Sequence, residues 1–105
     1  MKTISWLNEA WDELQEIRDY VLTEHGSRSA ERVQEDIFAR IDPLESMPEL
    51  GTLDTELHYH GKPVRILHSK HTRIIYAVHE TEVVIIMLWN NLRDDSMLKT
   101  IISQR

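Results

Sequence analysis

The sequence predicts an α+β domain in which an antiparallel helical hairpin packs on one face of a small antiparallel sheet. Two observations lead to this prediction. Apolar residues recur every three or four positions along 7–21 and along 30–44, which is the period of an amphipathic helix. Three runs rich in β-branched and aromatic residues follow at 64–69, 73–79 and 82–89. With 105 residues, the chain is expected to form one domain over 1–105.

The chain is expected to open with a strand and a first helix. Residues 2–6 alternate around Ile4 and Trp6, as a short strand does. Asn8 is a candidate N-cap for the helix that follows, and Gly26 is its stop signal. One face of this helix is apolar: Leu7, Ala10, Trp11, Leu14, Ile17 and Val21.

A second amphipathic helix is expected to start near Ser27 or Ser29. Pro43 ends or kinks it, because proline cannot continue the hydrogen-bond ladder of a helix. Two such helices joined by a few residues form an antiparallel hairpin. The apolar stripe of the second helix is Ala30, Val33, Ile37, Ile41 and Leu44.

The second half of the chain is expected to supply the sheet. Residues 52–61 form a polar connection with room for a short strand, and the three β-rich runs follow Gly61. The last run is apolar on both faces, so it is expected to lie centrally in the sheet. A short closing helix is indicated by Met97, Leu98, Ile101 and Ile102.

The predicted order is thus β-α-α-β-β-β with a C-terminal helical tail. The first strand is expected to join the sheet, both helices to cover one face, and the other face to remain free for a binding site. One core is expected to contain Leu14, Ile17, Val33, Ile37, Tyr76 and Ile86.

Charge is distributed unevenly along this acidic chain. The net charge is −6, yet residues 58–79 contain four cations, five of the six histidines and no carboxylate. The other eight cations face all 18 carboxylates. A localised cationic segment indicates a binding surface for an acidic partner or target.

Composition also bears on redox chemistry, metals and location. Cysteine is absent, which excludes disulfides and thiolate metal sites. No zinc-ligand spacing surrounds His58 and His60, so we expect neither a metal nor a cofactor. The longest apolar run, 83–89, is far shorter than the roughly 20 residues of a membrane span. With no signal peptide visible, the chain is expected to be cytoplasmic and not associated with membranes.

Five blocks, in this order and spacing, resemble the ParE/RelE toxin superfamily over nearly the whole chain. The first two are Trp6 with Ala10, Leu14, Ile17 and Tyr20, and then Ile41, Leu44, Pro48 and Gly51. The others are 64–67 with Arg65, 73–76 with Arg73 and Tyr76, and the final strand and corner 83–93. At that corner no histidine is present and Asp95 stands where proline is usual. With the acidic net charge, this favours the ParE-like branch.

The resemblance implies the toxin of a type II toxin–antitoxin system. Such a toxin inhibits growth by binding a host target, here expected to be DNA gyrase, and is neutralised by a cognate antitoxin. It would act as a homodimer or as a heterotetramer with the antitoxin. One alternative is a RelE-like endoribonuclease that cuts mRNA on the ribosome. Another is a degenerate toxin that retains only antitoxin binding.

Three groups of residues are candidates for these roles. Arg65, Arg73 and Arg93 are expected to converge on the free face of the sheet and bind the target, unless they pair with nearby carboxylates. If the chain is a ribonuclease, the catalytic candidates are Lys70, His71, Arg73 and Arg93. Apolar surface for the antitoxin is expected at Trp11, Trp89, Ile101 and Ile102, unless these side chains are internal.

Overall fold

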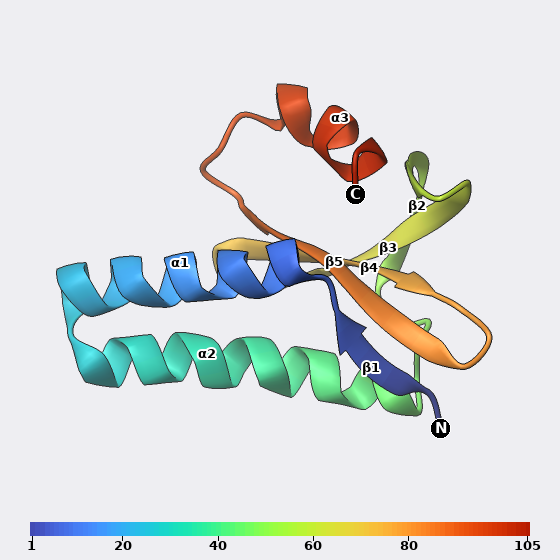
Figure 1. Ribbon diagram of the computed structural model, residues 1–105. Coiled ribbons are helices and arrows are strands. Elements are labelled where there is room, and N and C mark those ends of the chain that lie inside the picture. The colour runs from blue at the N-terminus through green and yellow to red at the C-terminus, as the bar shows by residue number, and fades with distance from the viewer.

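The computed structural model describes residues 1–105, and its elements follow the predicted order with one additional strand, β2 (Figure 1). They are β1 (Thr3–Trp6), α1 (Asn8–His25), α2 (Ser27–Ile41), the 3-10 turn η1 (Asp42–Glu45), β2 (Thr52–Tyr59), β3 (Lys62–His68), β4 (Thr72–Val78), β5 (Glu82–Asn90), the 3-10 turn η2 (Asp95–Met97) and α3 (Leu98–Ser103). None of the helices combines the length and apolar character needed to span a bilayer.

The ends of the helices match the predicted signals with one exception. Gly26 lies between α1 and α2 with φ +90°, a conformation that glycine adopts at little cost. α2 ends at Ile41, and Pro43 lies in the first turn of η1. The predicted cap Asn8 is instead the first residue of α1, and the cap position is Leu7, which makes no side-chain capping bond. Tertiary packing therefore stabilises this helix start.

The five strands form one sheet in the order β1-β5-β4-β3-β2. Neighbours from β2 to β5 are antiparallel, as predicted. β1 differs, because it pairs parallel to β5 with Thr3 opposite Glu82 and Trp6 opposite Ile85. The connection from β1 through the whole hairpin and three strands is long enough to allow this direction. β5 was predicted to be central; it is an interior strand between β1 and β4, although β1 pairs with it only from Glu82 to Ile85.

The helical hairpin covers one face of the sheet, as predicted. Its core includes Ala10, Leu14, Ile37, Ile41, Leu44, Ile74, Tyr76, Val83, Ile85 and Leu88, with Ile17 and Val33 packed against them. Ile86 was expected in this core, and that expectation is wrong. The register shifts where Ile75 pairs with Met87 and Tyr76 pairs with Ile85, so Ile86 is the extra residue of a β-bulge. It packs on the opposite face.

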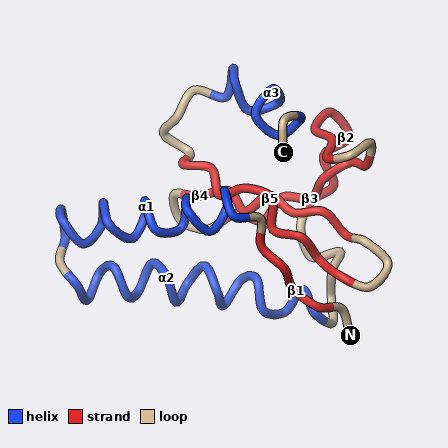
Figure 2. The backbone as a smooth tube through the Cα atoms, viewed as in Figure 1, coloured by secondary structure: helices blue, strands red, loops and turns tan.

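The opposite face of the sheet is not free, contrary to expectation. α3 folds back over it and lies beside β2, as Figure 2 shows. Leu98 and Ile102 of α3 are buried against a second core that includes Val64, Ile75, Ala77, Val84, Met87 and Trp89. Because β5 is apolar on both faces, the second face also requires a cover, and the C-terminal helix supplies it.

Candidate functional site

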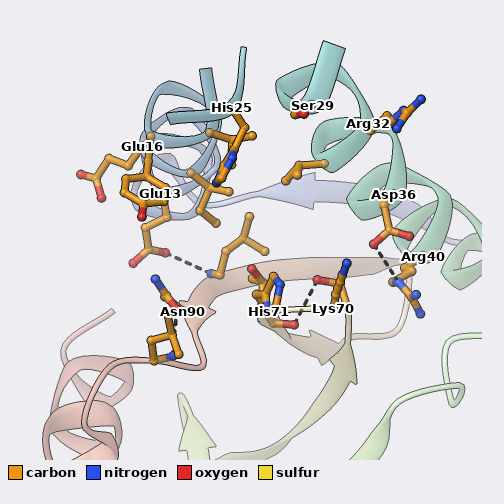
Figure 3. Close-up of a pocket in the computed structure, with 18 of the residues that line it drawn as sticks. Glu13, Glu16, His25, Ser29, Arg32, Asp36, Arg40, Lys70, His71 and Asn90 are labelled. Atoms are coloured by element: carbon orange, nitrogen blue, oxygen red, sulfur yellow. Dashed lines mark hydrogen bonds and ion pairs between the residues drawn. The ribbon is translucent and has the colours of Figure 1, made fainter. Parts of the chain in front are cut away.

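A groove of about 1130 Å³ lies where the hairpin meets the end of the sheet (Figure 3). The hairpin projects beyond the sheet in Figure 1. Residues 13–25 of α1 and residues 29–40 of α2 contribute to the lining of the groove. The remaining walls are the β3–β4 turn, residues 69–72, and the end of β5 with the corner after it, residues 88–93. The groove therefore joins segments that are far apart in sequence.

The groove carries an excess of unpaired positive charge. Of its three carboxylates, Glu13 is paired with Arg105 at 2.8 Å and Asp36 is paired with Arg40 at 3.1 Å. Only Glu16 has no cationic partner within ion-pair distance. The lining cations that belong to none of the chain's ion pairs are Arg32, Lys70 and Arg93. The groove is therefore a locally cationic region on a protein whose net charge is negative.

Glu13 and Arg105 close the edge of β5 that β1 leaves open. β1 pairs only as far as Ile85. Beyond it, Glu13 accepts a hydrogen bond from the Leu88 amide at 3.1 Å, and Arg105 donates to the Ile86 carbonyl at 2.9 Å. The Arg105 guanidinium also donates to both oxygens of Glu13 at 2.8 Å, which is the main reason that the pKa of Arg105 is raised. The two side chains take the place of a neighbouring strand.

Arg65 does not converge with Arg73 and Arg93. It lies opposite Tyr76 in the β3–β4 register, and Tyr76 faces the hairpin. Its guanidinium donates to the carbonyls of Gly51 at 2.8 Å and Glu49 at 3.3 Å. Strand alternation therefore turns Arg65 to the helix side, where it binds the loop before β2. The expectation that all three arginines meet on one free face is wrong.

Arg73 and Arg93 both lie near Trp89. Arg73 lies opposite Trp89 in the β4–β5 register and donates to Asn91 Oδ1 at 3.0 Å and to Asp95 Oδ1 at 2.5 Å. The guanidinium carbon of Arg93 lies 4.2 Å from the centre of the Trp89 ring, in a cation–π contact. Arg73 is thus engaged in the corner that leads to α3.

Of the ribonuclease candidates, three share the groove and one does not. Lys70, His71 and Arg93 line it, whereas Arg73 is absent from the lining. The histidine and cation that the hairpin contributes, His25 and Arg32, were missed. Both are exposed residues on the polar sides of their helices. The only sequence signal that could have found them is their position on either side of the turn at Gly26.

The apolar candidates for antitoxin binding are mostly internal. Trp89 and Ile102 are each 1% exposed, and Ile101 is half-buried against the second core. They were expected as partner surface, and the isolated chain covers them because α3 docks on the sheet. Trp11 remains 45% exposed, in an aromatic cluster with Trp6 at 5.4 Å and Phe38 at 6.4 Å between ring centres.

Comparison with known proteins identifies the family. The family model described as "ParE toxin of type II toxin-antitoxin system, parDE" matches residues 4–94. The chain belongs to the ParE toxin family. Among solved structures, a chain described as "Chromosomal ParDE TA system from P. aeruginosa" is similar with a TM-score of 0.71 and 22% identity. That similarity covers 86% of this chain and 96% of the other. No curated protein sequence matches.

In this ParE-family chain, one of the resembling blocks has a clear structural role. The Tyr76 hydroxyl is buried, donates to the Pro48 carbonyl at 2.7 Å and accepts from the Gly51 amide at 2.8 Å. Burial raises the pKa of Tyr76, so the phenol remains a donor at neutral pH. Together with Arg65, this hydroxyl fixes the loop that connects the hairpin to the sheet.

Acid is expected to loosen the corner at Asp95. The hydrogen bond from Arg73 is the largest cause that lowers the pKa of Asp95 below 3.8. Because the folded state has the lower pKa, the contribution of this carboxylate is complete above pH 3.8 and is lost as pH falls through the folded value. The indole N–H of Trp89, which donates to Asp95 at 3.3 Å, should shift in NMR spectra in that acid range. Asp95→Asn should abolish the titration, and an indole signal independent of pH in the parent would contradict the prediction.

Proposed function

We propose that this ParE-family chain inhibits bacterial growth by binding DNA gyrase in the cytoplasm, and that a cognate antitoxin neutralises it. Family membership over residues 4–94 is the observation that carries the proposal. Two observations support a binding mechanism over RNA cleavage. The net charge is −6, and the guanidinium of Arg73 is already paired with Asp95. We assign the target contact to Arg93, because it is exposed and forms no ion pair.

The second candidate function is ribosome-dependent mRNA cleavage. It is favoured by one observation, which is that Lys70, His71 and Arg93 line the same groove together with His25. Histidine titrates near neutral pH and can transfer protons, while lysine and arginine can stabilise a phosphate. A degenerate toxin that retains only antitoxin binding would show neither activity.

The two functions are separated by running two assays on the same variants. Purified toxin is tested for inhibition of gyrase supercoiling and, in parallel, for cleavage of mRNA during translation. We expect supercoiling to be inhibited, and Arg93→Ala to weaken that inhibition by a factor of about 5–150, as interface truncations commonly do. Lys62→Ala is the control, because Lys62 is exposed and lies outside the groove.

The opposite result would identify an enzyme. Codon-specific cleavage of translated mRNA, with activity lower by about 10²–10⁴-fold in folded His71→Ala or Lys70→Ala variants, would overturn the gyrase proposal. Growth arrest that is relieved by co-expression of the adjoining reading frame would support the toxin–antitoxin assignment in either case. If neither assay responds while that protein still binds, the chain is a degenerate toxin.

A further inference from the structure

The loop that connects η1 to β2, residues 46–51, is fixed to the sheet by hydrogen bonds (Figure 1). It contains a turn in which the Leu50 amide donates to the Met47 carbonyl at 3.3 Å, and the proline at its second position favours that turn. The buried Tyr76 hydroxyl and the Arg65 guanidinium bind its main chain from the sheet side. A segment held in this way loses little conformational entropy when it binds a partner.

Three large apolar side chains on and beside this loop face solvent. The exposed fraction is 52% for Met47, 50% for Leu50 and 47% for Leu53. Leu53 lies opposite Arg65 in the β2–β3 register, and the Arg65 guanidinium reaches the loop carbonyls, so Leu53 is a neighbour of the loop. Single exposed apolar residues are common, but three within residues 47–53 on a fixed turn are typical of an interaction surface. We call Met47, Leu50 and Leu53 the turn patch.

The surroundings of the turn patch are acidic. Residues 42–61 contain five carboxylates and no lysine or arginine, and none of the five belongs to an ion pair. A cavity of about 410 Å³ adjoins the loop, and Glu45 and Glu80 are in its lining. Lys2 and Met1 line it too, but the Lys2 ammonium donates to two main-chain carbonyls, and neither residue forms an ion pair. Both carboxylates are therefore available to a cation of a partner.

This charge selects a basic partner. The surface repels an acidic protein, and it is complementary to one that presents lysine or arginine beside apolar side chains. Gyrase, the target proposed above, acts on DNA, and proteins that bind DNA present lysine and arginine to its phosphates. The turn patch is also separate from the cationic groove. Glu80 precedes β5, whereas Arg93 of the groove follows it.

We propose that the turn patch, together with Glu45 and Glu80, docks on a basic surface of gyrase. The inference rests on the proposed function and adds a second target contact to that of Arg93. Met47 and Leu50 pack on apolar side chains of the target, and the two carboxylates bind its lysine or arginine side chains. The length of β5, about 30 Å, separates this contact from Arg93, so the two engage different parts of the target.

Substitutions in the patch test the inference with purified gyrase as the probe. Supercoiling inhibition and direct binding are measured for each variant, after circular dichroism and urea denaturation have shown that it is folded. Leu50→Gln is expected to inhibit at least about 10-fold more weakly than the parent, as the loss of an apolar anchor does. The charge-reversal variant Glu45→Lys, Glu80→Lys is also expected to lose at least about 10-fold. All three side chains are exposed, so the fold should be retained.

Matched controls exist for both kinds of change. Leu22→Gln removes a leucine that is 46% exposed, close to the 50% of Leu50, and lies outside both cavities. Glu24→Lys, Glu35→Lys makes the same change in net charge at exposed positions that line neither cavity. Both controls should inhibit supercoiling within about threefold of the parent.

Methionine oxidation locates the contact in the unaltered toxin. Peroxide converts exposed methionine to its sulfoxide, and Met47 is 52% exposed. Its oxidation should be slower in the complex with gyrase than in the free toxin. The purified product of the reading frame beside the toxin gene should leave that rate unchanged. Met87, which is fully buried, should stay unoxidised in every state and thereby reports an intact fold.

The possible outcomes separate this inference from the proposed function. Full inhibition by folded Leu50→Gln, or oxidation of Met47 at an unchanged rate in the gyrase complex, would overturn the inference alone. Normal inhibition combined with lost binding of the neighbouring gene product would assign the turn patch to the antitoxin and would also overturn it. If the parent itself does not inhibit supercoiling, the proposed function fails, and the target named here fails with it.

Discussion

Replacing Gly51 with alanine is expected to lower the free energy of unfolding by about 3 kcal/mol. A Cβ at this position would lie 2.7 Å from the hydroxyl oxygen of Tyr76, 2.8 Å from its Cε1 and 3.0 Å from the carbonyl oxygen of Ile66. Tyr76 is fully buried and cannot move away without breaking its hydrogen bonds to Pro48 and Gly51. Strain and lost hydrogen bonds therefore add together.

Urea denaturation followed by circular dichroism measures this effect. Gly61→Ala is the control, because a Cβ there meets no atom within 4 Å and the only cost, of about 1–2 kcal/mol, comes from its positive φ. The double variant Gly51→Ala, Tyr76→Phe should be less destabilised than the sum of the single variants, since removal of the hydroxyl relieves the closest contact. Wild-type stability of Gly51→Ala would show that this loop is not fixed to the sheet.

Truncation of Trp89 to alanine is expected to cost about 3–5 kcal/mol, which is typical for a large aromatic residue in a core. Its indole is 1% exposed and belongs to the same core as Leu98 and Ile102, so the truncation opens a cavity beneath α3. The cation–π contact between Arg93 and the indole ring, and the hydrogen bond from the indole N–H to Asp95, are lost as well. We therefore expect α3 to undock before the rest of the chain unfolds.

Trp11 provides the matched comparison, because the same substitution there removes a side chain that is 45% exposed. Trp11→Ala should cost no more than about 1 kcal/mol, mainly from contacts with Trp6 and Phe38. Thermal unfolding of both variants, with hydrogen exchange of α3, measures the difference. Equal losses in the two variants would contradict the burial that we assign to Trp89. Any loss of antitoxin binding by folded Trp11→Ala would assign this residue to the partner surface.

Much of the fold could be predicted from periodicity. The 3.6-residue stripes through Leu14 and Ile37 identify two helices with one apolar side each, and the alternation through Ile74 and Tyr76 identifies a strand that faces them. The bulge at Ile86 could not be predicted, because one extra residue reverses the alternation without changing the composition of the run. Ile86 and Met87 consequently pack on the same face, opposite to the hairpin, and the alternation of the residues after them is reversed.

The candidate site was only partly predictable. Lys70 and Arg93 were identified as cations in the right half of the chain, and the structure brings them into one groove. Arg65 and Arg73 have the same residue type, but Arg65 binds loop carbonyls and Arg73 binds Asp95. Residue type shows that a guanidinium can bind an anion, but strand direction and nearby acceptors decide whether it is available to a partner.

The sequence by itself determined the element types, the helical hairpin, the interior position of β5 and the resemblance to ParE toxins. Only the tertiary structure decided the parallel pairing of β1, the cover that α3 places on the second face, and the groove at the end of the hairpin. Periodicity reports which side of an element is apolar, but it does not report what covers that side. The cover depends on contacts such as Glu13 with Arg105, which lie 92 positions apart and form only when the chain is folded.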